Sequence, residues 1–395
     1  MKILIIHNAY GKYSGEEAVV DRMYAMLTRH GHSVVKYSRS SEEIGTAITK
    51  KIYAFFSGIY SYKGVKEVRE ILKREKPDIV NIHNLYPLIS PAALFECKKN
   101  GVPVVMTIHN FRLICPTGLF MRNGTTCELC RENMNEWGCI RYNCERSAFK
   151  SVGYALRNAY ARWTGAYMKN VTHYACITAF QREKLISVGF DADRISVIPN
   201  FVDIKKREPY IEGKYVAYCG RFSPEKGVDL IIEVARRHPE IPFKMAGEVR
   251  DPEIISLIPK NVELVGYLSG DSLNEFYRKS AFIVMASRCY EGFPMSILEA
   301  AQHSKCTIGP AHGGFMEIIG KDENSIGALF KPGDVDDLED KVVTFWKDKQ
   351  RIKDLGLSAS KKLEDEYSEE VIYNKWEKLL SRLVDENSYK KDAFL

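Results

Sequence analysis

Residues 282–301 read FIVMASRCYEGFPMSILEAA, a stretch that changes character twice. Its first five residues form a short apolar run, as expected of a strand that is buried on both faces of a sheet. A loop with Glu291 and Gly292 follows. Pro294 then favours the start of a helix from Met295, because proline lacks an N–H that would be unpaired there. A strand, loop and helix in this order predict a parallel sheet covered by helices.

The same alternation runs along the whole chain and predicts two α/β domains. Strands are expected at 2–6, 33–37, 78–82, 102–107, 174–177 and 195–198, and again at 215–219, 243–246, 262–265, 282–286 and 306–308. We predict two Rossmann-like, doubly wound parallel sheets that face a central cleft, since ligands bind at the carboxyl ends of parallel strands. The domains are expected at 1–200 and 201–370, joined through the polar stretch 203–214, with a helix in 371–395 packing back toward the first domain.

Composition and charge limit the function classes. The chain has 395 residues, no apolar run of membrane-spanning length and no signal-peptide pattern, so a cytoplasmic location is expected. Residues 1–195 hold 28 Lys and Arg against 17 Asp and Glu, or +11, and the remainder brings the total to +6. A basic first half favours an anionic partner, or serves solubility alone. Nothing resembles a nucleic-acid recognition module.

The loop CGRFSPEKG at 219–227 has the equipment to bind a diphosphate. Gly220 permits a tight turn, while Arg221 and Lys226 supply a forked donor and a point charge beside a helix start. Glu291 and Glu299 would stand on either side of the turn at Pro294, where carboxylates can accept hydrogen bonds from sugar hydroxyls. Two solvated cations on a surface loop are the alternative interpretation of Arg221 and Lys226.

Two features of the first domain are weaker. Gly15 follows the first strand and would let the backbone approach a ligand closely, although a helix-entry glycine explains it equally well. His109 ends a strand and could hydrogen-bond a substrate hydroxyl or a developing charge, although a lone histidine is usually structural.

The order of these motifs resembles the retaining glycosyltransferases of family 4, which have the GT-B fold. The matching stretches are SGEE at 14–17, PDIVNIHN at 77–84, TIHN at 107–110, ITAFQREKL at 177–185, IPNFVD at 198–203, CGRFSPEKG at 219–227, AGE at 246–248, VGYL at 265–268, EGFPMSILEAA at 291–301 and GGFMEI at 313–318. Two positions depart from the family pattern, because Ser14-Gly15 replaces a common Gly-Gly and Asn200-Phe201 replaces a common Asn-Gly.

The resemblance implies roles for named residues. Arg221 and Lys226 would hold the donor diphosphate, His109 would reach the sugar near the reacting carbon, and Glu291 would contact the donor sugar. The other implied contacts to the donor are Gly15, Gly220, Tyr267, Leu268, Gly292, Phe293, Pro294, Met295, Ser296 and Glu299, with Glu299 on the ribose and Tyr267 and Leu268 near the base. Glu291 as a nucleophile, in the manner of glycosidases, is the less favoured alternative.

The implied activity is a retaining transfer of a sugar from a nucleoside-diphosphate sugar to a glycan or a lipid-linked acceptor, such as a polyprenyl diphosphate. Surface polysaccharide synthesis is the expected setting, as in capsule, O-antigen or lipopolysaccharide. Catalysis would need no metal or other cofactor, because Arg221 and Lys226 would balance the diphosphate charge. A sugar-nucleotide epimerase on the same scaffold and a non-catalytic nucleotide-sugar-binding subunit are the alternatives. A phosphorylase would be longer and would carry a pyridoxal-phosphate lysine.

Cysteines gather in residues 115–144. A C-x2-C pair at 127–130 with further cysteines nearby predicts a structural zinc in this insertion, with packed thiols as the alternative. The resemblance favours Cys115, Cys127, Cys130 and Cys144 as ligands and leaves Cys139 as the spare.

Two basic and aromatic stretches suggest contact with a membrane. Residues 50–64 and 147–170 place lysines and arginines among aromatic side chains, at helical spacing in the second stretch. Such segments suit an interfacial helix. We therefore expect peripheral binding to the inner face of the cell membrane, with core aromatics and solvated cations as the alternative.

Overall fold

The computed structural model describes residues 1–132, 135–204, 209–322 and 324–392. Within them the chain divides into two compact units. The first takes in the described residues of 1–119 and 128–199 together with those from Ile372 onward, and the second those of 120–127 and 200–371. The predicted connection at 203–214 lies partly outside the described residues, at 205–208.

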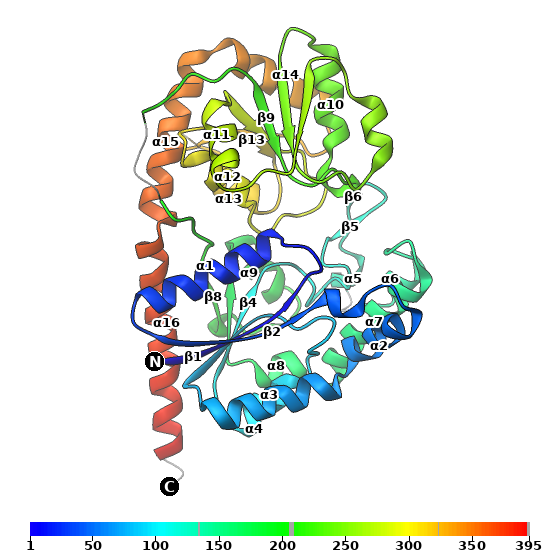
Figure 1. The fold of residues 1–395 in the computed structure, drawn as a ribbon, viewed down its shortest axis with the longest axis vertical. Helices are drawn as coiled ribbons and strands as arrows, with labels where there is room; N and C mark the ends of the chain where they lie inside the picture. Colours follow the sequence, from blue (N-terminus) through cyan, green and yellow to red (C-terminus); the bar gives the residue numbers. More distant parts are fainter. Residues whose placement is uncertain (133–134, 205–208, 323, 393–395) are drawn as a thin grey trace. The chain divides into compact units, whose positions relative to one another are not determined.

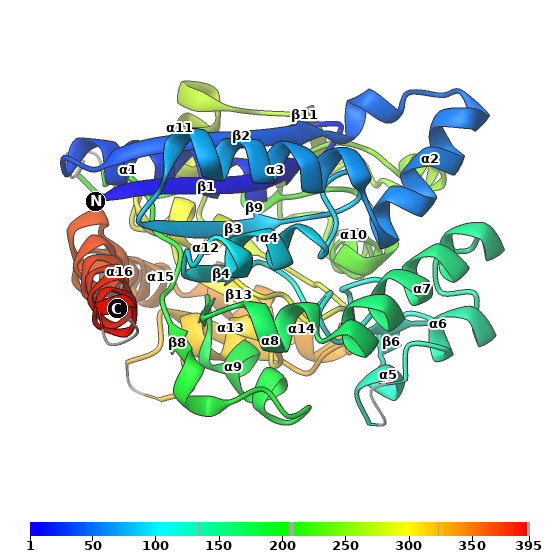
Figure 2. The ribbon, with the colours of Figure 1, turned by 90° about the horizontal axis from the view of Figure 1, so that it is seen from below.

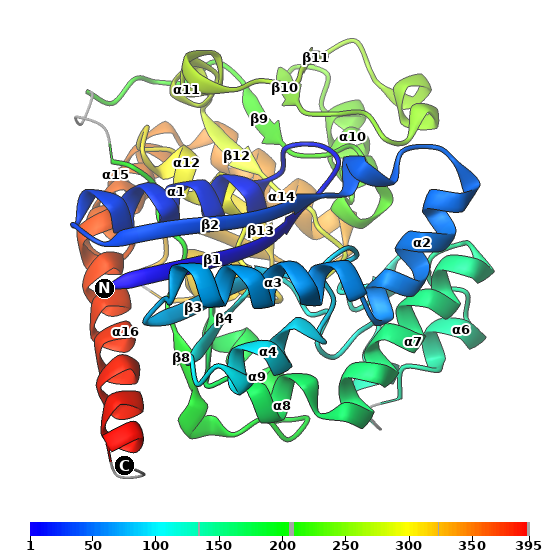
Figure 3. The same ribbon diagram turned by 60° about the horizontal axis from the view of Figure 1, so that its bottom comes forward.

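The first unit is built on a six-stranded parallel sheet, and Figure 3 shows three of its strands, β2, β1 and β3, side by side. In spatial order the strands are β2 (Ser33–Ser40), β1 (Lys2–Ala9), β3 (Ile79–Asn84), β4 (Val104–Ile108), β7 (His173–Cys176) and β8 (Ile195–Val197). Ile3, Leu4, Ile5 and Ile6 are all fully buried, which is typical of a parallel strand covered on both faces. The predicted doubly wound sheet is therefore confirmed.

Helices cover this first sheet. Helix α1 begins with a capping box in which Ser14 and Glu17 satisfy each other's backbone amides. The helices are α1 (Gly15–Arg29), α2 (Ile48–Ile59), α3 (Tyr62–Glu75), α4 (Ala93–Lys99), α5 (Leu129–Glu132), α6 (Gly138–Arg141), α7 (Ala148–Thr164), α8 (Ala166–Asn170) and α9 (Ala179–Ile186). No helix in the described ranges has both the length and the apolar character that crossing a bilayer requires.

The C-terminal helix α16 (Glu369–Asp392) packs against the first unit, beside the start of β1 and β2 (Figure 2). The Tyr373 ring stacks on the His30 ring at a centroid distance of 3.5 Å. Glu377 lies 3.0 Å from His32 Nε2. These contacts tie the end of the chain to the turn between α1 and β2.

The second unit is a six-stranded parallel sheet with helices packed around it (Figure 1). Its strands in spatial order are β11 (Val262–Gly266), β10 (Phe243–Ala246), β9 (Val216–Cys219), β12 (Phe282–Val284), β13 (Thr307–Pro310) and β14 (Gly327–Phe330), and its helices are α10 (Val228–Arg237), α11 (Gly270–Lys279), α12 (Met295–Ala301), α13 (Gly314–Ile319), α14 (Val335–Lys347) and α15 (Lys349–Tyr367). A short antiparallel pair, β5 (Met121–Arg122) and β6 (Thr125–Thr126), belongs to the same unit.

The second sheet confirms the predicted class and adds one strand that the sequence did not reveal. Strand β14 pairs with β13 in the register Thr307 to Gly327. A Cβ on Gly327 would lie 1.8 Å from the Thr307 carbonyl oxygen, so this pairing requires glycine at the strand start. Because this strand is short and begins with glycine, its apolar pattern is too weak to predict it.

Candidate functional site

The strand order of the second unit locates its binding region. Strands β9 and β12 are neighbours, but the chain winds away from them in opposite directions along the sheet. Ligands of doubly wound folds bind where the order reverses, at the carboxyl ends of the two strands. The loop at 220–227 follows β9, and the loop at 285–294 follows β12. The two stretches with the strongest sequence signals therefore meet at the switch point.

An ion pair joins these two loops. Lys226 Nζ donates to Glu291 Oε1 at 2.5 Å, and both side chains are 16% exposed. Ser287 Oγ donates to the same Glu291 oxygen at 2.7 Å. Burial opposes both charges, but the Coulombic attraction wins, so the pKa of Lys226 is raised and the pKa of Glu291 is lowered. Both groups are therefore charged at neutral pH.

Arg221 stands at the entrance of the same loop with more of its side chain in solvent. Its guanidinium lies 3.3 Å from Glu225, and its side chain is 43% exposed. The Tyr218 hydroxyl donates to the Arg221 carbonyl at 2.7 Å, and Ser223 Oγ holds Glu225 at 2.7 Å. The backbone that carries Arg221 is thus fixed, while its guanidinium can reach an anion.

Two glycines let the loops pack this tightly. Gly227 has φ +61, and a Cβ there would lie 2.0 Å from the Ala286 carbonyl oxygen. Gly247 has φ +142, and a Cβ there would lie 1.8 Å from the Gly220 carbonyl oxygen. Only glycine accommodates such contacts. These close approaches bring the β9 loop against the end of β12 on one side and of β10 on the other.

Helix α12 carries the remaining carboxylate of the predicted site. Glu299 Oε2 accepts a hydrogen bond of 3.1 Å from the Tyr277 hydroxyl. Ser296 Oγ donates to the Cys219 carbonyl at 3.3 Å, which ties the first turn of α12 to the end of β9. Pro294 is the N-cap of this helix, which begins at Met295 as predicted. Phe293 is buried and packs on Tyr367.

Other residues predicted to contact the donor are Tyr267, Leu268 and Gly292. Tyr267 follows β11, a strand at the edge of the sheet, and is 68% exposed. Leu268 is half-buried beside it. Gly292 lies under Gly314, whose Cβ would come within 2.4 Å of the Gly292 carbonyl oxygen. Among the predicted site residues, the structure brings Lys226 and Glu291 into direct contact.

The first unit holds Gly15 and His109. Gly15 is the first residue of α1, with open space around its Cα. His109 follows β4, and its Nε2 lies 2.7 Å from His83 Nδ1. Burial lowers the pKa of His109. The sequence analysis assigned no role to His83 or Ser287, although His83 lies in the quoted PDIVNIHN stretch at the end of β3.

The predicted zinc ligands are divided between the units. Cys115, Cys130 and Cys144 belong to the first unit, and Cys127 belongs to the second. The thiol of Cys139, the predicted spare, is hydrogen-bonded to Cys144, which together with burial raises the pKa of Cys139. Across the described residues, no three His, Cys, Asp or Glu side chains are arranged to hold a metal ion. No chemical step below depends on a metal at these thiols.

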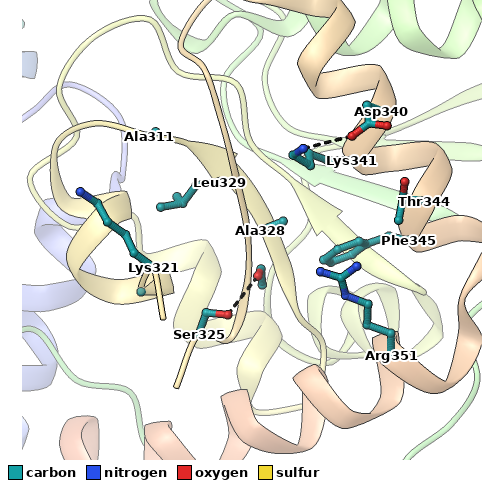
Figure 4. Close-up of a pocket in the computed structure, with 12 residues that line it drawn as sticks. Ala311, Lys321, Ser325, Ala328, Leu329, Asp340, Lys341, Thr344, Phe345 and Arg351 are labelled. Carbon is teal, nitrogen blue, oxygen red and sulfur yellow. Dashed lines mark hydrogen bonds and ion pairs between the residues drawn. The ribbon is translucent and has the colours of Figure 1, made fainter. Parts of the chain in front are cut away.

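A pocket of about 530 Å³ lies elsewhere in the second unit (Figure 4). It is lined by residues of β14 and α14, such as Leu329, Lys341 and Phe345, and by Ala311, which follows β13. Lys341 pairs there with Asp340 at 3.0 Å. None of the predicted site residues lines this pocket, so it is separate from the switch point.

The chain is similar to known glycosyltransferases. Residues 13–206 match the family described as Glycosyltransferase Family 4, and residues 201–362 match Glycosyl transferases group 1. An uncharacterised glycosyltransferase of Methanocaldococcus jannaschii is 32% identical over 76% of this chain and 75% of its own length. An uncharacterised 42.6 kDa protein of Klebsiella pneumoniae, named for a cps region, is 26% identical over 87% of this chain and 96% of its own. The crystal structure of Anabaena HepE in complex with UDP-glucose aligns with a TM-score of 0.69 at 16% identity, covering 97% of this chain and 100% of that one.

Proposed function

Because the chain belongs to the group 1 and family 4 glycosyltransferases, with the two doubly wound sheets of the GT-B fold, we propose that it transfers a sugar from a nucleoside-diphosphate donor with retention of configuration. The acceptor is a glycan or a lipid-linked sugar of a surface polysaccharide. The relative named for a cps region supports this setting. The UDP-glucose bound to the HepE structure supports a nucleoside-diphosphate sugar as the donor.

The Lys226–Glu291 pair at the β9–β12 switch point is the observation that carries the proposal. An ammonium held by a carboxylate at 2.5 Å is fixed in place before any ligand arrives. Arg221, on the same loop, adds a partly exposed guanidinium. A buried and an exposed cation together suit a diphosphate whose negative charge grows as the bond to the sugar breaks. This is the work that a divalent cation does elsewhere, and we propose that no metal is needed.

The acidic groups suit the carbohydrate parts of the donor. Glu291 already accepts hydrogen bonds from Lys226 and Ser287 on one oxygen. These contacts lower its basicity and make it a poorer nucleophile, which favours a role in holding sugar hydroxyls. Glu299 is oriented by Tyr277 and would accept hydrogen bonds from the ribose.

A screen of donors followed by product analysis tests the proposal. Thermal shifts with a panel of nucleoside-diphosphate sugars identify the donor, because a ligand that binds the folded state raises its melting temperature. The best binder is then incubated with candidate acceptors, and NMR gives the anomeric configuration of the product. We expect a new glycoside with the donor's configuration, formed equally well in EDTA. An altered nucleotide sugar with no transfer would indicate an epimerase, and an inverted product would reject retention.

A surface on α2 and α7 supports a further part of the proposal, that the enzyme docks on the membrane that holds a lipid-linked acceptor. The two helices lie side by side, with the Phe55 and Phe149 rings 4.6 Å apart (Figures 2 and 3). Phe56 and Trp163 are 62% and 64% exposed. Exposed lysines accompany these side chains: Lys50, Lys51 and Lys150. Apolar side chains flanked by cations are the features of an interfacial helix on an anionic bilayer.

Vesicle flotation tests the docking surface. We expect the protein to float with vesicles that contain anionic lipid, and the double variant Phe56→Ser/Trp163→Ser to float several-fold less. Ile255→Ser/Leu257→Ser, at exposed apolar residues of the second unit, is the matched control and should float like the parent. If the parent stays in the soluble fraction at low salt, the docking proposal is wrong.

The predicted structural zinc is separate from this chemistry and stays a prediction. Elemental analysis of protein purified without chelator decides it. One zinc per chain would support a site that draws the thiols of 115–144 together, and protein without metal would remove the prediction.

A further inference from the structure

Three histidines stand at the carboxyl ends of three adjacent strands in the first unit. His7 is on β1, His83 is on β3 and His109 follows β4. The order β2-β1-β3-β4 reverses between β1 and β3, so this group lies at the switch point of the first sheet. His7 and His83 are almost fully buried.

His83 and His109 form one hydrogen-bonded unit. His83 Nδ1 and His109 Nε2 are 2.7 Å apart, and the ring planes differ by 17°. Such a contact needs a proton on one nitrogen and a lone pair on the other. Burial lowers the pKa of both imidazoles. A charge on His109 would lower the pKa of His83 further, while Glu16 and Glu17 offset only part of the lowering at His109. The pair is therefore neutral, with one N–H proton on each ring, and one of these two protons lies in the hydrogen bond between the rings.

The surroundings of His83 decide where that proton sits. His83 Nε2 is buried and has no hydrogen-bond partner among the described residues. Buried N–H groups without an acceptor are rarer than buried acceptors without a donor. His83 therefore carries its proton on Nδ1 and leaves a lone pair on Nε2. His109 Nε2 must then accept, so His109 carries its own proton on Nδ1.

We infer that His83 is a positioning residue that fixes His109 as an Nδ1–H donor, leaving that N–H for a sugar hydroxyl oxygen of the donor or acceptor. The role of His109 rests on the proposed function, whereas its tautomer does not. A neutral donor of fixed direction can hydrogen-bond a hydroxyl oxygen without attracting an anionic group. The neighbouring His7 ring meets His83 edge-on at a centroid distance of 6.3 Å, which limits rotation of the His83 ring.

The tautomer is measured directly by NMR of protein labelled with ¹⁵N-histidine at neutral pH, with the His109 signals assigned by their loss in His109→Asn. We expect His109 to be protonated at Nδ1, the less common form of a free imidazole. His83→Leu should allow Nε2–H to appear. His83→Asn should restore Nδ1–H, since the Asn amide can donate from the position of His83 Nδ1. A wild-type His109 protonated at Nε2 would overturn the inference, whatever the variants do.

Kinetics separate positioning from structural support. His83→Leu should lower kcat by about tenfold or more with a smaller change in KM, the loss expected when one transition-state hydrogen bond is misdirected. His83→Asn should recover most of it. His173→Leu is the matched control, because it removes another buried imidazole of the same sheet, hydrogen-bonded to Ser196 at 2.8 Å. Its kcat should stay within about twofold of the parent.

The outcomes distinguish the two claims. An unchanged kcat in folded His83→Leu would reject the positioning role. If the wild type transfers no sugar, the proposed function fails, while the NMR result still decides the tautomer of His109.

Discussion

Lys226 on the loop after β9 donates to Glu291 on the loop after β12, with 2.5 Å between Lys226 Nζ and Glu291 Oε1. The pair joins the neighbouring strands at which the second sheet reverses its order. Its consequence is a cation that is fixed in advance where a diphosphate is expected.

Removing a cation from this region should affect catalysis selectively. Arg221→Ala should lower kcat/KM by about a hundredfold, as losing one charged contact to a developing anion does. Arg236→Ala, at an exposed arginine of α10 that pairs with Glu233 at 2.6 Å, is the control and should stay within about twofold. Steady-state transfer assays with the identified donor measure both. Equal losses in the two variants would reject the role of Arg221.

Loss of the Tyr277 hydroxyl should weaken donor binding. Tyr277→Phe removes the 3.1 Å hydrogen bond that orients Glu299, and the KM for the donor should rise by about fivefold, equivalent to about 1 kcal/mol. Tyr215→Phe removes a buried hydroxyl that donates to the Phe276 carbonyl at 2.7 Å, and it should cost stability alone. A donor KM that is unchanged in Tyr277→Phe would contradict the assignment of Glu299.

The close contact at Gly227 should be essential to the fold of the second unit. Gly227→Ala places a methyl group 2.0 Å from the Ala286 carbonyl oxygen, so we expect destabilisation by about 3 kcal/mol or more. Gly333 also has a positive φ, +79, but open space around it, and Gly333→Ala should cost only about 1 kcal/mol. Denaturant unfolding compares them, and similar losses would show that strain in φ, rather than the contact, dominates.

Glu17 should make stability depend on acid pH. Burial alone would raise its pKa, but contacts with His7, Ser14 and the Tyr10 amide lower the pKa to about 2 from the ordinary 4.5. A carboxylate with a lowered pKa stabilises the fold above its unfolded-state value and loses this contribution as pH falls toward the folded value. The advantage of wild type over Glu17→Gln, about 1–3 kcal/mol at pH 7, should therefore shrink below about pH 4.5. A difference that is constant from pH 7 to 3.5 would contradict this.

The fold was largely predictable because its strands are buried on both faces. Runs such as Ile3–Ile6 have no other plausible environment in a domain of this size, and the loops after them carry the polar residues. Strand β14 escaped because its first residue is a glycine required by backbone contact with Thr307. Apolar periodicity carries no signal for such a constraint.

The site was predictable only as a set of positions. Lys226 and Glu291 were identified through motif spacing, but their mutual contact joins residues 65 positions apart in sequence, and the hydrogen bond from Ser287 depends on how the loop after β12 turns. His83 was overlooked for the same reason. A histidine at the end of an apolar strand gains meaning only when the next strand places a second imidazole 2.7 Å away.

A crystal structure of the protein with a bound nucleoside diphosphate, such as UDP, tests the central claim most directly. We predict diphosphate oxygens within hydrogen-bonding distance of Lys226 Nζ and the Arg221 guanidinium, with the ribose on Glu299. A diphosphate bound instead in the pocket lined by Ala311, Lys341 and Arg351, without contact to Lys226, would contradict the account.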